Sequence, residues 1–499
     1  CRFGLDFPFQ SISDYRNPRT FHISAMAPAV LRGLTCLVLG TPVSLGIYFD
    51  ATFHGFARPS ERAAGEYYWP AGHGRTGQDG YSPYPGPQNL TADFDWSWHH
   101  PLGRFHTVPY GTTIDGEKNI YLFTDTSLWK LSPHGDLLWT FKPTPAAAIF
   151  SAGSLLDGRV HFTTLDGRFW AVSMATGEVL WSRKLCEAIN YDNGFVSAHE
   201  GVVVAHGNAS SVDYVQQKRA NRIVFALSAV DGSTLWTYEP QVPVWNFLAS
   251  FPGDGTVLYQ DWEGRAYCHN LRSGALIWKA GGHPASWTDG SPLLASGVLW
   301  TVSAYMFPPY LMQRGSLAPG RLAARNASSG QLLWETSVPL PPNNAPAIGR
   351  IPGSTGLTIV QPGGYQGMKG GKTGLFAFDA LTGAERWSFH GPPQRESQQA
   401  GAVEGFLERR RAGATPSYVT NPWSAPSIDV HGTVYIGHED GLLFAIRDAN
   451  ADGRIEGKGE VSAFDTGSAF VGCSSPAHAP GMLAVANCEG LFVFRAPLA

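Results

Sequence analysis

A spaced Gly-x-x-x-Trp motif recurs along most of this 499-residue chain. The motif occurs at Gly135–Trp139, Gly177–Trp181, Gly232–Trp236, Gly274–Trp278, Gly330–Trp334 and Gly383–Trp387, and Trp98 extends the series toward the N-terminus. The residue ten before the tryptophan is usually small: Ala171, Ala226, Cys268, Ala324 and Ala377. Self-similarity at spacings of about 40 to 55 residues is typical of a repeat architecture, in which each unit buries its apolar face against the next one.

Each repeat contains short strand-like segments separated by glycine-containing turns. Residues 160–163 and 256–259 are predicted strands, and the pairs Asp166-Gly167 and Glu263-Gly264 are predicted turns that lead into a second strand. The glycine before each tryptophan suits a turn with positive φ. Four short strands in about 40 residues are the content of a propeller blade. The sequence therefore predicts an all-β chain, folded as a β-propeller of four-stranded antiparallel blades.

The number of strand pairs sets the number of blades. Eight pairs begin near Ile120, Val160, Val202, Val257, Val298, Leu357, Val434 and Leu483. The last pair ends without a tryptophan strand, whereas residues 94–98 form a tryptophan strand without a pair. We therefore expect residues 94–98 to pair with residues 482–494 and to close the ring, since closure removes free sheet edges. The prediction is eight blades, or seven if residues 421–464 are not a true blade.

The repeat unit also resembles a known family. Ala377–Trp387 reads AFDALTGAERW, which is similar to the A-x-D-x-x-T-G-x-x-x-W unit of the pyrroloquinoline-quinone (PQQ)-like repeat propellers. The resemblance covers about residues 67–499, and it implies a propeller fold. It also implies a docking role between blades for Trp98, Trp139, Trp181, Trp236, Trp278, Trp334 and Trp387. That family includes enzymes, assembly factors and sensors, so the resemblance indicates a fold rather than an activity.

Composition excludes two classes of protein. The chain has 36 basic and 40 acidic residues and a net charge of −4, so a basic surface for nucleic acid is not expected. No run of 18 residues is cleanly apolar, which excludes a polytopic membrane protein. We expect a monomer with at most one membrane anchor, at its N-terminus.

The first 66 residues are expected to be a leader rather than part of the fold. Residues 26–49 contain one early basic residue and then an apolar stretch, which is typical of a signal peptide or signal anchor; an ordinary buried segment is the alternative. Three Asn-x-Ser/Thr sequons, at Asn89, Asn208 and Asn326, favour export and glycosylation. The predicted localisation is the secretory pathway, with an extracellular or lumenal product.

One segment has the residue pattern of a calcium loop. Asp448, Asn450 and Asp452 place oxygen ligands at positions 1, 3 and 5, and Gly453 follows at position 6. Arg454 would offer its carbonyl at position 7, Glu456 holds position 9, and Glu460 lies one residue beyond position 12. Calcium in a structural role is the prediction, and a polar turn is the alternative.

A disulfide is predicted between Cys473 and Cys488. Cys473 lies just before the first strand of the last repeat and Cys488 just after its second strand. In an antiparallel pair these two ends lie side by side. The alternative is two unpaired thiols.

Long insertions follow several second or fourth strands, at residues 207–221, 304–320, 361–374 and 391–421. All four would project from one face, which we expect to hold a protein or small-molecule ligand; surface insertions without a binding role are the alternative. PQQ enzymes of this fold hold the quinone and Ca²⁺ over the central channel, and many carry two adjacent cysteines, which this chain lacks. The expected function is therefore a non-catalytic binding or scaffold propeller. The alternative is a PQQ- and calcium-dependent quinoprotein dehydrogenase that oxidises an alcohol or sugar.

Overall fold

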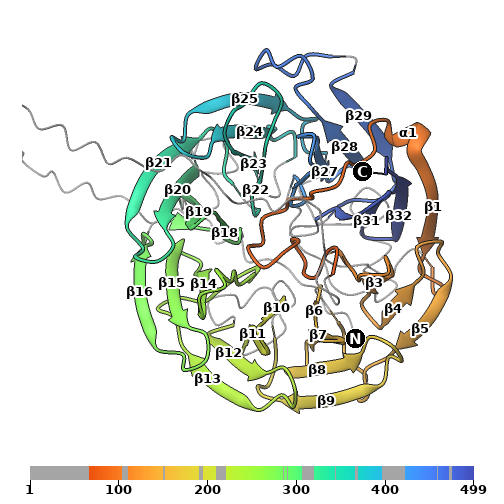
Figure 1. Cartoon of the computed structure of the whole chain (residues 1–499), viewed down its shortest axis with the longest axis vertical. Coiled ribbons are helices and arrows are strands. Elements are labelled where there is room, and N and C mark those ends of the chain that lie inside the picture. Colours follow the sequence, from red (N-terminus) through yellow and green to blue (C-terminus); the bar gives the residue numbers. More distant parts are fainter. Residues whose placement is uncertain are drawn as a thin grey trace, which may run out of the picture. The chain divides into compact units, whose positions relative to one another are not determined.

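Short antiparallel sheets make up almost all of the structure, a computed structural model (Figure 1). It describes residues 67–103, 111–149, 152–189, 195–208, 221–284, 286–288, 290–305, 320–342, 344–365, 369–395, 422–457, 459–470 and 475–498. Eight sheets stand in a ring, which confirms the predicted eight-bladed propeller. The seven-bladed alternative is wrong, because residues 427–465 form a four-stranded sheet of their own.

The first four blades follow one another in sequence. Blade 1 is β2 (Thr112–Ile114), β3 (Ile120–Phe123), β4 (Leu128–Leu131) and β5 (Leu137–Phe141). Blade 2 is β6 (Ser154–Leu156), β7 (Arg159–Thr164), β8 (Arg168–Ser173) and β9 (Val179–Lys184). Blade 3 is β10 (Val196–His199), β11 (Val202–Gly207), β12 (Ile223–Ser228) and β13 (Thr234–Tyr238). Blade 4 is β14 (Thr256–Gln260), β15 (Arg265–Asn270) and β16 (Leu276–Gly281), with the bridge between Ser250 and Leu258 in the inner position.

The last four blades complete the ring. Blade 5 is β17 (Ser286–Trp287) and β18 (Leu293–Ala295), which share the inner position, then β19 (Val298–Tyr305), β20 (Gly320–Asn326) and β21 (Leu332–Val338). Blade 6 is β22 (Ala347–Gly349), β23 (Thr358–Gly364), β24 (Thr373–Asp379) and β25 (Glu385–His390). Blade 7 is β26 (Ser427–Ile428), β27 (Val434–Gly437), β28 (Leu442–Ile446) and β29 (Val461–Asp465). Blade 8 is β30 (Ala477–Ala479), β31 (Met482–Ala486), β32 (Gly490–Arg495) and β1 (Phe94–His99).

Burial changes from the inner strands of a blade to the outer ones. In blade 2 the second strand, RVHFTT, is buried from its second residue to its last, whereas the outer strand, VLWSRK, buries only its tryptophan. The middle strands lie between two neighbouring blades, so both of their faces need apolar side chains, while the outer strand faces water. This explains why the repeats combine apolar runs with polar outer strands.

The two ends of the propeller meet in blade 8. The strand β1, which precedes blade 1, pairs antiparallel with β32, with Trp98 opposite Leu491 and Ser97 opposite Phe492. The one described helix, α1 (Leu90–Asp93), leads into this strand and is capped by the side chain of Asn89. Each blade therefore has four strand positions filled, and no blade leaves an open seam in the ring.

The recurring glycine and tryptophan belong to a contact between neighbouring blades. Trp139, Trp181, Trp236, Trp278 and Trp334 donate from Nε1 to main-chain oxygens of the next blade, those of Met174, Ala229, Leu271, Ala327 and Ala380, over 2.9–3.2 Å. Each indole lies over the turn glycine of that next blade. A Cβ on Gly177, for example, would lie 2.8 Å from the ring of Trp139. Glycine is required there both by its positive φ and by the indole above it.

The closing blade differs from the sequence prediction, because its docking residue is Trp96 and not Trp98. Trp96 donates to the carbonyl of Pro133 over 3.1 Å, and its ring lies over Gly135. A β-bulge just before Trp96 matches the bulge just before the docking tryptophan of blade 2. Trp98 instead packs against Trp129, with ring centroids 5.2 Å apart. The same bulge precedes the docking tryptophan of blades 1 and 3, so Trp96 and not Trp98 has the equivalent position, which the spacing between tryptophans alone does not reveal.

Candidate functional site

Residues 67–89, called the plug segment below, run across the middle of the ring before the closing strand (Figure 1). Its carbonyls accept hydrogen bonds of 2.8–3.0 Å from inner-strand amides of six blades. The pairs are Ile114 N to Trp69 O, Leu155 N to Pro70 O, Phe251 N to Thr76 O, Leu294 N to Gly77 O, Ile348 N to Asp79 O and Ile428 N to Gly80 O. The inner edges of these six blades are thus satisfied by one stretch of chain.

Glycines in the plug segment allow its main chain to reach the blades. A Cβ on Gly77 would lie 2.1 Å from the carbonyl oxygen of Leu294. Gly80 has a φ of +61°, and a Cβ there would lie 2.7 Å from that of Ala347. Any side chain at these positions would push the plug segment away from the inner strands and break the hydrogen bonds.

Polar side chains hold the plug segment in place. Arg75 pairs with the carboxylate of Asp79, and its guanidinium lies 5.2 Å from the centre of the Tyr81 ring. His73 is fully buried, with Nε2 2.9 Å from the carbonyl oxygen of Pro346, and burial lowers the pKa of this imidazole. The plug segment is therefore an integral part of the core.

Buried side chains from several connectors come together beside the plug segment. Phe195, Leu248 and Ala469 each precede the inner strand of a blade, and they belong to one continuous apolar cluster with Cys488 of blade 8. Both the plug segment and these connectors thus occupy the space that a ring of blades leaves at its centre.

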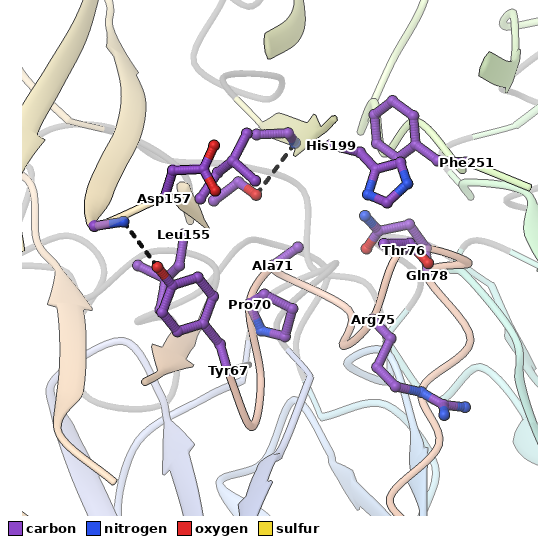
Figure 2. A pocket seen from close by; sticks show the side chains of 14 residues that line it. Tyr67, Pro70, Ala71, Arg75, Thr76, Gln78, Leu155, Asp157, His199 and Phe251 are labelled. Atoms are coloured by element: carbon purple, nitrogen blue, oxygen red, sulfur yellow. Dashed lines mark hydrogen bonds between the residues drawn. The ribbon is translucent and has the colours of Figure 1, made fainter. Parts of the chain in front are cut away.

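A cavity of about 610 Å³ opens between the plug segment and blades 2, 3 and 4 (Figure 2). Its apolar wall includes Tyr67, Leu155 and Phe251, and polar groups come from Arg75, Gln78, Asp157 and His199 among others. Tyr67 accepts a hydrogen bond from Gly158 N over 2.9 Å, and burial raises the pKa of its phenol. This volume is in the usual range for a small-ligand or peptide site. The cavity borders the turn between first and second strands, and so lies on the face opposite the predicted insertions.

Comparison with known proteins decides the family. A family model described as "Outer membrane protein assembly factor BamB" matches residues 124–282 and 286–451. The chain belongs to this BamB family. The match covers well over half of the sequence and includes six of the eight blades in whole or in large part. No curated protein matches the sequence of this family member.

Solved structures with the same fold include both assembly factors and enzymes. BamB from Moraxella catarrhalis is 14% identical with a TM-score of 0.52, over 81% of this chain and 99% of that chain. A europium-containing methanol dehydrogenase is 13% identical with a TM-score of 0.56, over 85% and 90% of the two chains. Quinohemoprotein alcohol dehydrogenase from Comamonas testosteroni is 13% identical with a TM-score of 0.57, over 86% and 80%. At these identities the likeness concerns the fold alone.

One junction of this BamB family member departs from the repeat. Trp387 of blade 6 is buried, yet within the described part of the chain its Nε1 has no hydrogen-bond partner. The docking turn of blade 7 is replaced by the longer loop that begins at Asp448, and a cavity of about 320 Å³ lies between Trp387, Asp448 and Ala451. The loss of the tight turn explains the missing acceptor.

The predicted calcium ligands lie together in the loop that begins at Asp448, between β28 and β29. In this structure their side-chain oxygens accept hydrogen bonds from main-chain amides. Asp448 accepts from the amides of Asp452 and Gly453, Asn450 accepts from Asp452, and Asp452 accepts from Arg454. Glu460 folds back to accept from Ala449 and Glu456. Among the described residues, no group of three or more His, Cys, Asp or Glu side chains is arranged to hold a metal ion. Calcium binding therefore stays a prediction.

The disulfide also stays a prediction. Cys488 is buried, and its amide donates to Ala469 O over 3.1 Å. Cys473 lies outside the described residues. Peptide mapping without reduction should recover both cysteines in one cross-linked fragment, and two alkylated thiols in the native protein would exclude the bridge.

The sequon asparagines lie at exposed or half-exposed positions. Asn89 caps α1, Asn208 follows β11 and Asn326 ends β20, where it accepts from the amides of Ser328 and Ser329.

The predicted targeting segment, residues 26–49, lies outside the described residues. In the described part of the chain, no helix is long and apolar enough to cross a membrane.

The insertion-bearing face is only partly described. Residues 209–220, 306–319 and 396–421 lie outside the described residues. The third expected insertion, at residues 361–374, is largely strand, because β23 and β24 continue their pairing to Gly364 and Thr373.

Sequence reasoning placed the ligand on this face and missed the plug segment. The dense glycines and prolines of residues 70–87 were the available signal, since they exclude regular strands and helices there.

Proposed function

We propose that this protein is a non-catalytic binding or scaffold propeller. The observation that carries the proposal is the plug segment, whose main chain fills the centre of the ring and bonds to six blades. A channel filled by the chain itself leaves the loops and faces of the propeller as the surfaces for recognition. The family description, outer membrane protein assembly factor, supports a partner that is a protein.

The residues at the centre do not fit a quinone cofactor. Main chain from Trp69 to Gly80 runs across the centre, and Phe195 and Leu248 are buried in an apolar cluster that packs against this segment. The chain also has no two adjacent cysteines.

The test of this proposal is reconstitution with the cofactor. Purified protein is incubated with PQQ and Ca²⁺, passed through a desalting column and assayed for dye-linked oxidation of alcohols and sugars. We expect no quinone absorbance in the protein fraction and no dye reduction. Quinone that co-elutes with the protein, together with alcohol-dependent dye reduction, would make the dehydrogenase alternative correct.

A structural calcium site in blade 7 is the second part of the proposal. It is supported by the oxygen pattern from Asp448 to Asp452, by the positive φ of Gly453 and by Glu460, which already folds over the loop. In calorimetry we expect one Ca²⁺ site that is absent from the Asp448→Ala plus Asp452→Ala variant. An unchanged isotherm in that variant would reduce the loop to a polar turn.

We also propose that the protein enters the secretory pathway as a monomer. The apolar stretch in residues 26–49 and the three sequons support this. Expression in a eukaryotic host should give a product whose mass falls on treatment with an N-glycosidase. A product of unchanged mass that stays inside the cell would contradict export.

A further inference from the structure

We propose that Glu439 makes the attachment of residues 391–395 to blade 7 depend on pH, so that the attachment is tighter in acid and looser as the pH rises. Residues 391–395 follow the last strand of blade 6, and Glu439 lies in the turn between β27 and β28 of blade 7. The inference goes beyond the proposed scaffold function and does not rest on it, because it concerns how one connection between two blades is held.

Glu439 departs from a turn position that four blades share. In blades 2, 4, 7 and 8, one residue stands before an acidic residue and a glycine in the turn between the second and third strands. Its amide donates over 2.9–3.1 Å to the connector that enters the same blade. The pairs are Leu165 N to Ala148 O, Trp262 N to Pro243 O, Glu439 N to Pro422 O and Cys488 N to Ala469 O. Leucine, tryptophan and cysteine suit this packed position, so the repeat alone does not account for a carboxyl group in blade 7.

The carboxyl group of Glu439 reaches the other end of the connection between blades 6 and 7. Its Oε1 accepts a hydrogen bond from the amide of Arg395, while the amide of Glu439 donates to the carbonyl of Pro422. Beside it, the ring of His438 packs against that of Trp423, with centroids 4.6 Å apart. One turn of blade 7 therefore holds the chain both where it leaves blade 6 and where it enters blade 7.

Other hydrogen bonds of this segment stay within blade 6. The amide of Gln394 donates to the carbonyl of Gly371 over 3.0 Å, and the hydroxyl of Thr373 donates to the carbonyl of Pro392 over 2.7 Å. These bonds hold the segment to its own blade. The bond from Arg395 to Glu439 is what ties it to the next one.

Burial makes this carboxyl group unusual. Glu439 is 0% exposed, and no described residue forms a hydrogen bond with its Oε2. A carboxylate in this place gives up water that a single amide does not replace. Burial therefore raises the pKa of Glu439, and the hydrogen bond from the Arg395 amide has a smaller, opposite effect.

The charged groups that face Glu439 come from its own turn and from the segment that it holds. His438 and Asp440 flank it in the turn, with Nδ1 of the histidine 2.8 Å from Oδ1 of the aspartate. Arg395 and His438 favour the carboxylate and Asp440 opposes it, each by less than burial does. Residues 422–424, the connector on its other side, carry no charged side chain.

The direction of the pH dependence follows from linkage. While the contact with Arg395 is made, Glu439 is buried and binds its proton above the ordinary pKa of 4.5. When residues 391–395 separate from blade 7, water reaches the carboxyl group and its pKa returns to the ordinary value. The attached form thus binds the proton more tightly, so protonation favours attachment and a rise in pH favours separation.

Hydrogen exchange of the Arg395 amide tests this in the full chain. Exchange is followed by mass spectrometry, with fragmentation that resolves single amides, between about pH 5 and about pH 8. Dividing each rate by that of the unfolded chain at the same pH removes the intrinsic effect of base. We expect the protection of this amide to fall as the pH rises. Protection that is constant or rises with pH would overturn the proposal.

Two substitutions separate the charge from the contact. Glu439→Gln keeps the acceptor oxygen and the shape of the protonated acid, so protection should be high and independent of pH. Glu439→Leu places in blade 7 the residue type found at the same position of blade 2. It should lower protection about tenfold, as expected for one lost hydrogen bond, without lowering global stability in urea. Glu117→Gln, at an exposed turn of blade 1, is the matched control and should keep the pH dependence of the parent.

The variants also define the results that refute the inference. A pH dependence that persists in Glu439→Gln would belong to another group, such as His438, and would overturn it. Protection in Glu439→Leu equal to that of the parent would show that the carboxyl group does not attach residues 391–395. If the leucine variant fails to fold, the comparison of the parent with Glu439→Gln still decides the question.

Discussion

Three buried histidines make the stability of the propeller depend on pH. His161 and His206 lie in the second strands of blades 2 and 3, fully buried, with ring centroids 5.7 Å from Trp181 and 4.9 Å from Phe247. Within the described structure neither ring has a hydrogen-bond partner. His478 of blade 8 is also buried, with Nε2 2.8 Å from the hydroxyl of Ser427. A proton on any of these rings would be a buried cation without a counter-charge.

The size of the effect follows from the pKa values. Burial lowers the pKa of each of the three imidazoles to about 3, from an ordinary value of 6.5. Because the unfolded chain then binds more protons, stability is complete above pH 6.5 and is lost as the pH falls toward 3. At pH 5 the loss is about 2 kcal/mol per histidine, or about 6 kcal/mol for three.

Buried carboxyl groups oppose part of this loss, because burial raises the pKa of Asp261 and that of Glu439. Burial raises the pKa of Asp261 to about 6, so its protonation in the folded state offsets about 1.5 kcal/mol at pH 5. From these three histidines and Asp261 alone, the expected net loss between pH 7 and pH 5 is about 4 to 5 kcal/mol. This is a large part of the 5–15 kcal/mol that is typical of folded proteins.

The assay is urea unfolding at pH 7 and pH 5, followed by tryptophan fluorescence and extrapolated to water. In the double variant His161→Gln plus His206→Gln, which keeps only one of the three rings, the loss on acidification should shrink by about 4 kcal/mol. His134→Gln, at an exposed turn, should leave it unchanged. If the double variant loses as much stability as the parent does, the histidines are not the cause.

Two further predictions use matched pairs of positions. Trp181→Phe removes a docking hydrogen bond and should cost about 1 kcal/mol more than Trp387→Phe, where there is none to lose; equal costs in urea unfolding would contradict the docking argument. Gly80→Ala should destabilise the protein by about 1 to 3 kcal/mol more than Gly103→Ala does. Both glycines have positive φ, but among the described residues only Gly80 has neighbours within 4 Å of a new Cβ, so similar melting temperatures would mean that the plug segment can yield.

Much of the ring could be predicted because the repeat is local. A glycine with positive φ and a tryptophan four residues later occur within one turn and strand, and each blade repeats them. The register of the closing strand could not be predicted in the same way. Spacing favoured Trp98, but a bulge between Phe94 and Trp96 puts Trp96 over the turn of blade 1. A one-residue bulge depends on pairing with β32, nearly 400 residues away.

The candidate site was harder to predict, because its parts are far apart in the sequence. The loop at Asp448 is recognisable since its oxygens are consecutive in the chain. The cavity instead combines Tyr67 with Leu155, His199 and Phe251, which come from the plug segment and the inner edges of three blades. None of these residues has a motif around it, so only their assembly identifies them.

The sequence by itself therefore determined the strand period, the turn glycines and the indole positions of blades 1 to 6, because those depend on contacts within one repeat and its neighbour. The tertiary structure decided what fills the centre. Residues 67–89 have no repeat pattern, and their conformation is set by inner-strand amides contributed from Ile114 to Ile428. Those amides need acceptors once they are buried, and only the closed ring brings them around one segment of chain.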